Sequence, residues 1–584
     1  MPRRRRISRS LTAVAVPAMA LAGCVFQDDD TDSVAMYPID DSRAANAATT
    51  ISFRGATADD FDDLVVTGSA SGEHDGALVD HPDGEGVSFR PAQPFDPGED
   101  VAISTSVDVL SNDDDGAVDG IGFTVAVNPD PPDELPTGAP SDLPDPEVLE
   151  FASMPDVRVP RATVDGDVGS GVFLATPQPL GDSTVGASII DHTGELVWWQ
   201  PAPDEDTSVG NLAVHEIDGE PVLAWFEGTA PFGRGKYVGE WIVVDSTYTE
   251  VTRIPGANGI PADIHDLTLT DRGTALVVAY HPVTMDLTDD GGPDVATVLD
   301  SVVQEIDLDT GDVYFEWHSV DEVPIADTRI DDLEGAVIDY AHINSVAESP
   351  DGNVLISLRH TSQVMELDRA TGDPVWILGG DANSVDVGDD MGISYPHHAR
   401  FLPDGTLSIF DNGVERDDPT SRGVVYELSE DGDSAEAVAV LAADPPVYTG
   451  TQGSIQVDDG ALAMWSELGL ATRFDDDANP TGTIDVGTGS YRLFSTQWIG
   501  RPAQPPTAVV DAGAISVSWN GATEVDRWEV LADDVAVETV RAEGFETRID
   551  LDPGVLDGSD TLEVRALDAA GDVLAGSTTT VDPS

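Results

Sequence analysis

Five polar residues stand at equivalent places in a repeated sequence pattern, and three of them are histidines. Each opens a short alternating run, and an x-Gly turn and a second apolar run follow; the five are Asn211, His265, His342, His397 and Gln452. Three imidazoles in one place can bind zinc, copper or iron. They can equally serve as nucleophile, acid and base on an anionic substrate. The pattern therefore predicts a polar site and leaves both chemistries open.

The far ends of the second runs add polar groups to this site. Seven residues after the turn glycines stand Tyr280, Arg359, Asn412 and Glu467. The end of the second strand of an antiparallel hairpin returns beside the start of the first, so we expect these residues close behind the five. Arg359 favours chemistry on an anion, because a guanidinium would repel a metal cation. Side chains alternate along a strand, so we expect His360 and His398 on the opposite face, in structural roles.

The spacing of the turns predicts how these hairpins are arranged. The turn glycines lie 54, 79, 53 and 55 residues apart, so one interval carries an insertion of roughly 25 residues. Alternating strands, x-Gly turns and this period are typical of a β-propeller. Five hairpins, together with one blade shared by the segments at Gly171 and Tyr491, predict an all-β fold with a six-bladed propeller over residues 147–500. Because the first and last segments of the repeat region would pair within one blade, the propeller would have no open edge.

Segments on both sides of the propeller have the pattern of smaller β domains. Short alternating runs predict a β-sandwich over residues 48–128, and similar runs predict a fibronectin-like β-sandwich over residues 507–582. A proline-rich linker is expected at residues 129–146. We assign no chemistry to the two sandwiches.

The charge of the chain excludes some partners. With 110 acidic and 27 basic residues its formal net charge is −83. Nucleic acid and anionic membrane surfaces are therefore poor partners. The acidic residues are spread through the whole sequence, which fits a soluble surface adapted to high salt; ordinary solvated acidity is the alternative.

The first residues predict export and a lipid anchor. A basic start, an apolar stretch and Leu21-Ala22-Gly23-Cys24 are typical of a bacterial lipoprotein signal over residues 1–24, with Cys24 lipidated. A plain cleaved signal is the alternative. Residues 25–47 are acidic and are expected to form a tether, so the protein would lie outside the cytoplasm and touch the membrane only through its anchor. A homodimer is left open.

Several motifs in the repeat region resemble one known family. His342-Ile-Asn-Ser-Val, the phrase ending Leu358-Arg359-His360-Thr-Ser, and Tyr395-Pro-His397 before Leu407-Ser-Ile-Phe-Asp-Asn-Gly are similar to bacterial aryl-sulfate sulfotransferases that do not use PAPS. Phrases near residues 151, 233, 262, 376 and 491 fit the same family, so the likeness covers roughly residues 146–500.

The resemblance implies a mechanism and assigns roles. A propeller histidine would be sulfated transiently in a ping-pong cycle between an aryl sulfate donor and a phenolic acceptor, with no metal or nucleotide cofactor. By motif His397 is the nucleophile; adjacent His398 is the other candidate, but only His397 lies eight residues before its turn glycine, as His265 does. His265 and His342 would bind sulfuryl oxygens or move the phenol's proton, and Arg359 would stabilise charge. We expect Tyr280, Asn412, Asn211 and Gln452 to contact the substrate.

Two other classes of function remain. One is a metal- or quinone-dependent propeller oxidoreductase, and the other is a non-catalytic propeller that binds sugars or proteins at the cell surface.

Overall fold

The computed structural model describes residues 34–110, 121–132 and 143–581, apart from residues 234, 332, 389, 512, 557 and 558. The protein is all-β, as predicted, with 50% of its residues in strands and 3% in helices. The helical pieces are α1 (Ser319–Glu322), α2 (Pro553–Leu556) and short 3-10 turns at Ala58–Asp60, Thr288–Asp290, Ile325–Asp327 and Ser466–Leu468. The expected signal peptide, with Cys24, lies outside the described residues.

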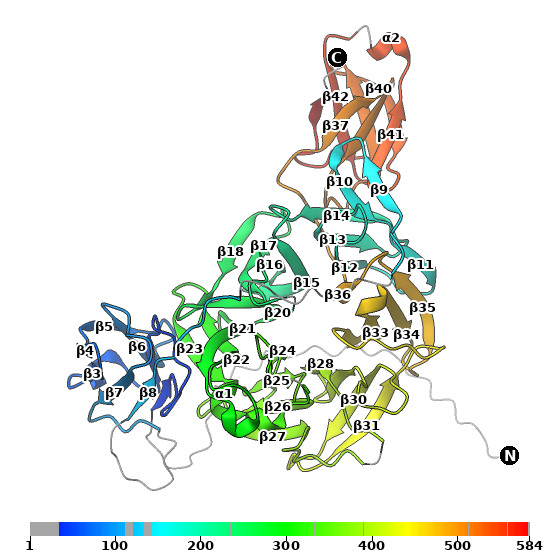
Figure 1. Ribbon diagram of the computed structural model, residues 1–584. Helices are drawn as coiled ribbons and strands as arrows, with labels where there is room; N and C mark the ends of the chain where they lie inside the picture. Colours follow the sequence, from blue (N-terminus) through cyan, green and yellow to red (C-terminus); the bar gives the residue numbers. More distant parts are fainter. Residues whose placement is uncertain are drawn as a thin grey trace, which may run out of the picture.

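The middle of the chain forms a series of antiparallel sheets around a common centre (Figure 1). One sheet has the order β14-β13-β12-β36 and consists of β12 (Val172–Pro177), β13 (Gly186–Asp191), β14 (Leu196–Pro201) and β36 (Ser490–Thr496). A nine-stranded sheet follows with β15 (Ser208–Ile217), β16 (Glu220–Thr229), β17 (Val238–Val244), β18 (Glu250–Ile254), β19 (Gly256–Ala257), β20 (Ile260–Leu269), β21 (Thr274–Met285), β22 (Ala296–Asp307) and β23 (Val313–His318).

Three further sheets continue the series. Two are four-stranded and comprise β24 (Ile343–Glu348), β25 (Val354–Leu358), β26 (Gln363–Leu367) and β27 (Pro374–Gly379), then β28 (Pro396–Phe401), β29 (Leu407–Asp411), β30 (Arg422–Leu428) and β31 (Ala435–Leu441). The last consists of β32 (Ser454–Asp458), β33 (Gly460–Trp465), β34 (Leu470–Phe474), β35 (Pro480–Asp485) and β11 (Thr163–Gly166).

The first strand of each hairpin lies on the inside of this arrangement. β15 contacts β12 and β20, β20 contacts β24, β24 contacts β28, β28 contacts β32, and β32 contacts β36 beside β12. These innermost strands therefore lie next to one another around a shared centre. The predicted pairing between the first and last segments of the repeat region is confirmed, because β12 pairs with β36, with Val172 opposite Thr496. No local pattern in the sequence predicts that β11 pairs with β35 at an outer edge.

The five predicted turns are present. The turn glycines all have a left-handed φ, between 74° and 93°, in Gly219, Gly273, Gly352, Gly405 and Gly460. Residues with a Cβ are strained there, so glycine fixes where each inner strand reverses.

Residues 34–110 and 121–132 form two four-stranded sheets that share one apolar cluster. Their strands are β1 (Ala35–Tyr37), β2 (Ile51–Arg54), β3 (Val65–Gly68), β4 (Gly72–Glu73), β5 (Gly76–Asp80), β6 (Gly86–Pro91), β7 (Asp100–Ser104) and β8 (Ile121–Thr124). The prediction of a tether up to residue 47 is wrong for residues 34–47. β1 pairs with β2, and Val34 and Met36 are buried in the cluster with Phe53, so this short acidic stretch still carries enough apolar side chains to fold.

The C-terminal sheets lie against the central ones (Figure 1). They contain β37 (Thr507–Asp511), β38 (Ala514–Ser518), β39 (Arg527–Ala532), β40 (Val535–Arg541), β41 (Glu546–Asp550), β42 (Leu562–Leu567) and β43 (Thr579–Val581). The pair β9 (Val148–Phe151) and β10 (Met154–Pro160) contacts the C-terminal part through Phe151, which packs against Phe545. Asn520 of the C-terminal part also bonds the backbone of Trp199 on β14. Among the described residues no helix is long and apolar enough to cross a membrane.

Candidate active site

The inner hairpins are irregular at the predicted site residues. Strand register shifts between Gly210 and Ala213, Ala262 and Leu267, Ile343 and Ser345, and His397 and Arg400. Asn211, His342 and Gln452 also have left-handed φ values of 56°, 57° and 61°. Bulges and left-handed residues re-aim side chains, and non-glycine residues in this region are often found at functional sites. The opening residues of the repeats therefore do not follow the regular alternation of side chains along a strand.

His265, on β20, is held by a buried carboxylate. Its Nδ1 bonds to Asp263, and Asp263 also accepts the backbone N–H groups of His265 and Tyr237 at 2.9 and 2.7 Å. The ring lies among aromatic neighbours, with its centroid 4.9 Å from that of His342 and 5.5 Å from that of Tyr491. Because Asp263 binds Nδ1, Nε2 is the nitrogen left to exchange a proton.

His342 stands immediately before β24 and has a similar partner. Its Nδ1 is 2.5 Å from Asp339 Oδ2, and Lys236 Nζ is 3.4 Å from the same oxygen. Burial alone would raise the pKa of Asp339, but attraction to His342, His360 and Lys236 prevails and holds this pKa below its usual range. A carboxylate therefore orients this imidazole also.

His397, on β28, is oriented by neutral groups. Its Nδ1 lies 2.7 Å from the amide oxygen of Asn412, and its Nε2 accepts the backbone N–H of Gln452 at 3.1 Å. The amide nitrogen of Asn412 donates to the carbonyls of Thr449 and Gln452, at 2.8 and 3.0 Å, so the amide orientation is fixed. Burial lowers the pKa of His397 well below its ordinary value, and Arg359 and His342 lower it further. The ring is thus neutral, with its lone pair on Nε2.

Arg359, just after β25, supplies a cation beside these rings. Its guanidinium donates to the carbonyl of Gly450 at 2.9 Å and lies 4.8 Å from the ring centre of Tyr395. Its buried Nε has no hydrogen-bond partner among the described residues. Burial lowers the pKa of Arg359, although this group stays cationic at any working pH.

The expectation that His360 points away from the site is wrong. Its ring centroid is 4.7 Å from that of His342, its Nδ1 is 2.5 Å from the carbonyl of Asp339, and its Nε2 is 2.5 Å from Arg359. β25 ends at Leu358, so strict alternation no longer applies at residues 359 and 360. Asp339 and Asp263 were also missed, because each lies outside the repeated positions.

The other predicted contact residues are distributed around the cluster. Tyr280 donates its hydroxyl to the carbonyl of Ile343 at 2.8 Å, and Asn211 donates to the carbonyl of His265 at 2.9 Å. The Gln452 side chain accepts from Gln178 at 3.1 Å. Glu467 accepts the backbone N–H of Gly450 at 2.6 Å, so it holds the loop that Arg359 contacts.

His398 does point away, as predicted. It lines a cavity of about 400 Å³ whose charged and polar lining includes Asn211, His215, Asp266, Arg400, Gln456 and Arg492. Asp266 bonds both Arg400 and Arg492, each at 2.6 Å. His265, His342 and His397 are absent from this lining. Asp266, His398 and Arg492 each follow a residue of the other cluster (His265, His397 and Tyr491), so neighbouring residues of the inner strands contribute to two separate polar regions.

The sequence of this region decides its family. Residues 213–485 match the family model of arylsulfotransferase (ASST). This region belongs to the arylsulfotransferase family. The match spans β16 to β35 and contains His265, His342, Arg359 and His397. The family resemblance expected from the motifs is therefore confirmed, and sulfotransferase activity in general is supported.

Other comparisons are weaker. No curated protein matches the chain. A protein of unknown function from Bacteroides caccae is 14% identical with a TM-score of 0.35, over 56% of this chain and 98% of that one. Virginiamycin B lyase from Staphylococcus aureus is 11% identical with a TM-score of 0.28 (64% and 95%), and the Dos1 propeller is 10% identical with a TM-score of 0.29 (79% and 95%). At these scores the likenesses carry no argument about function.

Proposed function

We propose that this arylsulfotransferase works without PAPS and moves a sulfuryl group from an aryl sulfate ester to a phenol through a sulfated His397. The observation that carries the proposal is the state of His397: a buried, neutral ring whose Nδ1 faces Asn412 and whose Nε2 holds the lone pair. A nucleophilic imidazole needs this protonation state. Arg359, close enough to lower the pKa of His397, supplies the charge that an incoming sulfate ester requires.

The first half-reaction forms an N–S bond and breaks an S–O bond. Nε2 of His397 leaves the backbone N–H of Gln452 and attacks sulfur, while the aryl oxygen departs and takes a proton from His265 or His342. Asp263 and Asp339 accept from Nδ1 of these two histidines, so each ring presents Nε2 to the substrate. Burial lowers the pKa of His342 well below its ordinary value, which favours His265 as the proton donor. In the second half-reaction the same imidazole removes the proton of the acceptor phenol, whose oxygen attacks sulfur and releases His397.

Arg359 and the donors around it stabilise the transferring group. Its unpartnered Nε is available to a sulfuryl oxygen. Sulfuryl transfer is expected to be loose and in line, like phosphoryl transfer, so positioning and fixed positive charge provide most of the acceleration. We assign a positioning role to four residues, because their hydrogen bonds hold the backbone and side chains around the three histidines: Tyr280, Asn211, Gln452 and Asn412.

The fold that fits this site is a six-bladed propeller between two β-sandwiches. The circuit of contacts from β12 through β15, β20, β24, β28 and β32 supports six blades, with the nine-stranded sheet counted as two. The two flanking units are assigned as sandwiches because the sheets of each share one apolar cluster.

A metal-dependent reaction is the other candidate at this site. Ligand atoms of Asp339, His342 and His360 lie within 4.8 Å of one another. However, Lys236 lies 3.4 Å from Asp339, and Arg359 lies 2.5 Å from His360. Two cations against this cluster favour an anionic substrate over a metal ion.

The purified protein should release 4-nitrophenol from 4-nitrophenyl sulfate in the presence of a second phenol. Initial rates over a grid of both substrates should give parallel double-reciprocal lines, as a ping-pong reaction requires. Intersecting lines would contradict the covalent intermediate, and activity only with added PAPS would contradict the proposed donor.

We also propose that the protein is exported and held at the membrane by a lipid on Cys24. The sequence Leu21-Ala22-Gly23-Cys24 supports this anchor. A Cys24→Ser variant should leave the membrane fraction or remain unprocessed. Membrane fractionation unchanged from the parent would contradict the anchor.

A further inference from the structure

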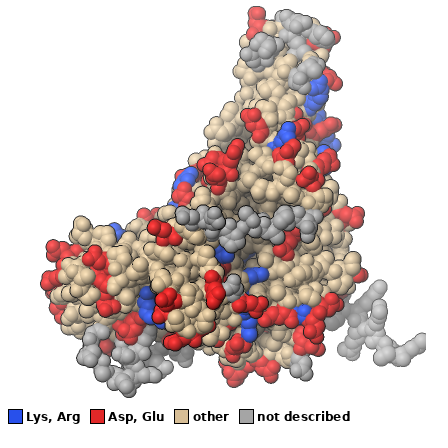
Figure 2. Space-filling model, in the orientation of Figure 1, with Lys and Arg blue, Asp and Glu red and all other residues tan. Residues whose placement is uncertain are grey.

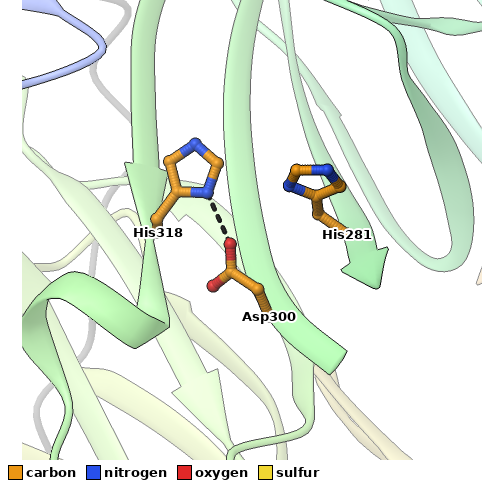
Figure 3. Close-up of side chains that lie close together, drawn as sticks. All are labelled: His281, Asp300 and His318. Atoms are coloured by element: carbon orange, nitrogen blue, oxygen red, sulfur yellow. Dashed lines mark hydrogen bonds and ion pairs between the residues drawn. The ribbon is translucent and has the colours of Figure 1, made fainter. Parts of the chain in front are cut away.

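A second histidine cluster lies outside the candidate active site, on one face of β21, β22 and β23. His281 and Asp300 oppose each other in the pairing of β21 with β22, and His318 ends β23. One ligand atom from each side chain lies within 4.8 Å of the other two, and all three residues are buried. Figure 3 shows the side chains converging, with a ring nitrogen of His281 turned toward Asp300.

His281 has one ring nitrogen satisfied and one that is not. Nε2 lies 2.6 Å from the amide nitrogen of Asn128 and 3.3 Å from that of Asn46. Nδ1 is buried and has no hydrogen-bond partner among the described residues. Leaving a buried polar nitrogen unpaired destabilises a fold, so a native protein is expected to give it a ligand.

The charges of the cluster also call for a cation. Asp300 Oδ2 is 2.5 Å from His318 Nδ1, and Glu316 Oε1 is 3.4 Å from His318 Nε2. Within the described part of the chain these two buried carboxylates form ion pairs with His318 alone. Both carboxylates also accept hydrogen bonds from neutral donors, Glu316 from Gln304 and Asn258 and Asp300 from Ser319 and Val320. A single imidazolium neutralises the charge of only one of them, whereas a divalent cation beside neutral imidazoles neutralises both.

We propose that His281, Asp300 and His318 bind one divalent transition-metal cation, of which zinc fits the donors best. Imidazole nitrogen and carboxylate oxygen are ligands that zinc takes, and three protein ligands leave a fourth position for water. The ion replaces the proton between His318 Nδ1 and Asp300 Oδ2 and gives His281 Nδ1 its partner. The proton of His281 then resides on Nε2. The Asn128 amide turns over to accept this proton with its oxygen and gives up its 3.0 Å bond to the carbonyl of Pro282.

The position of the cluster indicates what the ion does. The two asparagines that contact His281 belong to the N-terminal sheets and their connections, and the backbone N–H of Thr284 on β21 donates to the carbonyl of Val127 at 2.9 Å. The site therefore lies where the N-terminal unit covers β21–β23. Metal binding there would fasten this unit to the central sheets, independently of sulfuryl transfer.

The test measures bound metal in the full chain, expressed without a histidine tag. The protein is stripped with EDTA, dialysed against Zn²⁺ or Co²⁺ in molar KCl, which suppresses loose binding to surface carboxylates, and washed. We expect about one ion per chain in the parent, visible d–d absorption with Co²⁺, and a higher Tm in the loaded protein. His281→Asn should lose all three effects.

Two further variants locate the ion. His398→Asn removes one buried imidazole elsewhere and should keep the metal, and so should His360→Asn in the Asp339 cluster. His281 contacts the side-chain amides of Asn46 and Asn128 and the backbone of Ala44, so its variant is a local change. Urea unfolding of the stripped forms checks that it folds. The proposal is overturned if the parent binds no more metal than His281→Asn, if its Tm is the same stripped and loaded, or if His360→Asn loses the ion instead.

Discussion

The amide oxygen of Asn412 lies 2.7 Å from Nδ1 of His397 and gives this ring its tautomer. The same amide donates its N–H groups to the carbonyls of Thr449 and Gln452, so its oxygen cannot be exchanged for its nitrogen without losing two bonds. His397 must then donate from Nδ1 and keep the lone pair on Nε2. A carboxylate performs this task for His265 and His342, whereas His397 has a neutral partner. A neutral partner favours a nucleophile over a general base, because it does not stabilise the protonated ring.

His397→Asn should abolish turnover and leave no sulfated peptide, because an amide cannot form the N–S bond. His398→Asn is the matched control: its ring faces the cavity with Arg400 and Arg492, so this variant should retain most activity. Mass spectrometry of enzyme quenched during turnover locates the sulfated residue. Sulfation at His398, or full activity in His397→Asn, would reassign the nucleophile.

Asn412→Asp should shift the acidic limb of the pH profile of kcat/KM to higher pH. A carboxylate beside Nδ1 favours the imidazolium, so the pKa of His397 should rise and the neutral nucleophile should disappear at a higher pH than in the parent. Asn412→Leu should lower kcat by about 10²-fold or more without that shift, because it loses the tautomer but adds no charge. Equal pH profiles for parent and Asn412→Asp would show that Asn412 only supports the fold.

The sequence predicted the site residues that stand at repeated positions, and it missed those that lie outside the repeat. The eight-residue interval before the turn glycine placed His265 and His397. His398 faces away as predicted, although a bulge at this position and its left-handed φ of 48° interrupt the alternation on which that prediction was based. Alternation failed for His360 because β25 stops at Leu358. Asp263 lies two residues before His265, and Asp339 lies three residues before His342, the histidines that they orient. These positions have no counterpart in the other repeats.

Longer-range contacts were beyond the sequence for a different reason. β11 pairs with β35 across some 320 residues of chain, and no local pattern records that choice. Residues 34–47 were assigned to a tether on composition, yet three strand residues and a few buried apolar side chains suffice once β2 provides an edge. Average composition is a weak guide over so short a segment.

The protein should lose stability as pH falls from about 7 to 5. Burial lowers the pKa of His81, His215 and His360 to about 4, so the folded state keeps them neutral while the unfolded chain protonates them near 6.5. Between these values the unfolded state binds more protons, and the free energy of unfolding must therefore fall with decreasing pH, by about 2 kcal/mol for each fully buried histidine. Urea unfolding at pH 5, 6 and 7 in molar KCl measures this loss while salt screens the surface carboxylates.

His215→Gln is the control for that pH dependence. It removes one of several buried, neutral imidazoles, because His281, His342, His397 and His398 have lowered pKa values as well. The slope of unfolding free energy against pH should therefore fall measurably, with the m-value unchanged. An unaltered slope would mean that the neutral histidines are not its source.

Added KCl should stabilise the protein against urea. Acidic side chains are spread over the face shown in Figure 2, and the 110 acidic and 27 basic residues of the chain mean that repulsive pairs outnumber attractive ones. Salt weakens both kinds of pair, including exposed bridges such as Arg253–Glu240, so its net effect is stabilising. The free energy of unfolding should rise steeply at low salt and level off near about 1 M, where the Debye length is about 3 Å. A rise that continues linearly beyond this point, and is larger in sulfate at equal ionic strength, would instead indicate salt exclusion acting on apolar burial. No dependence on KCl would leave the excess of carboxylates without a role in stability.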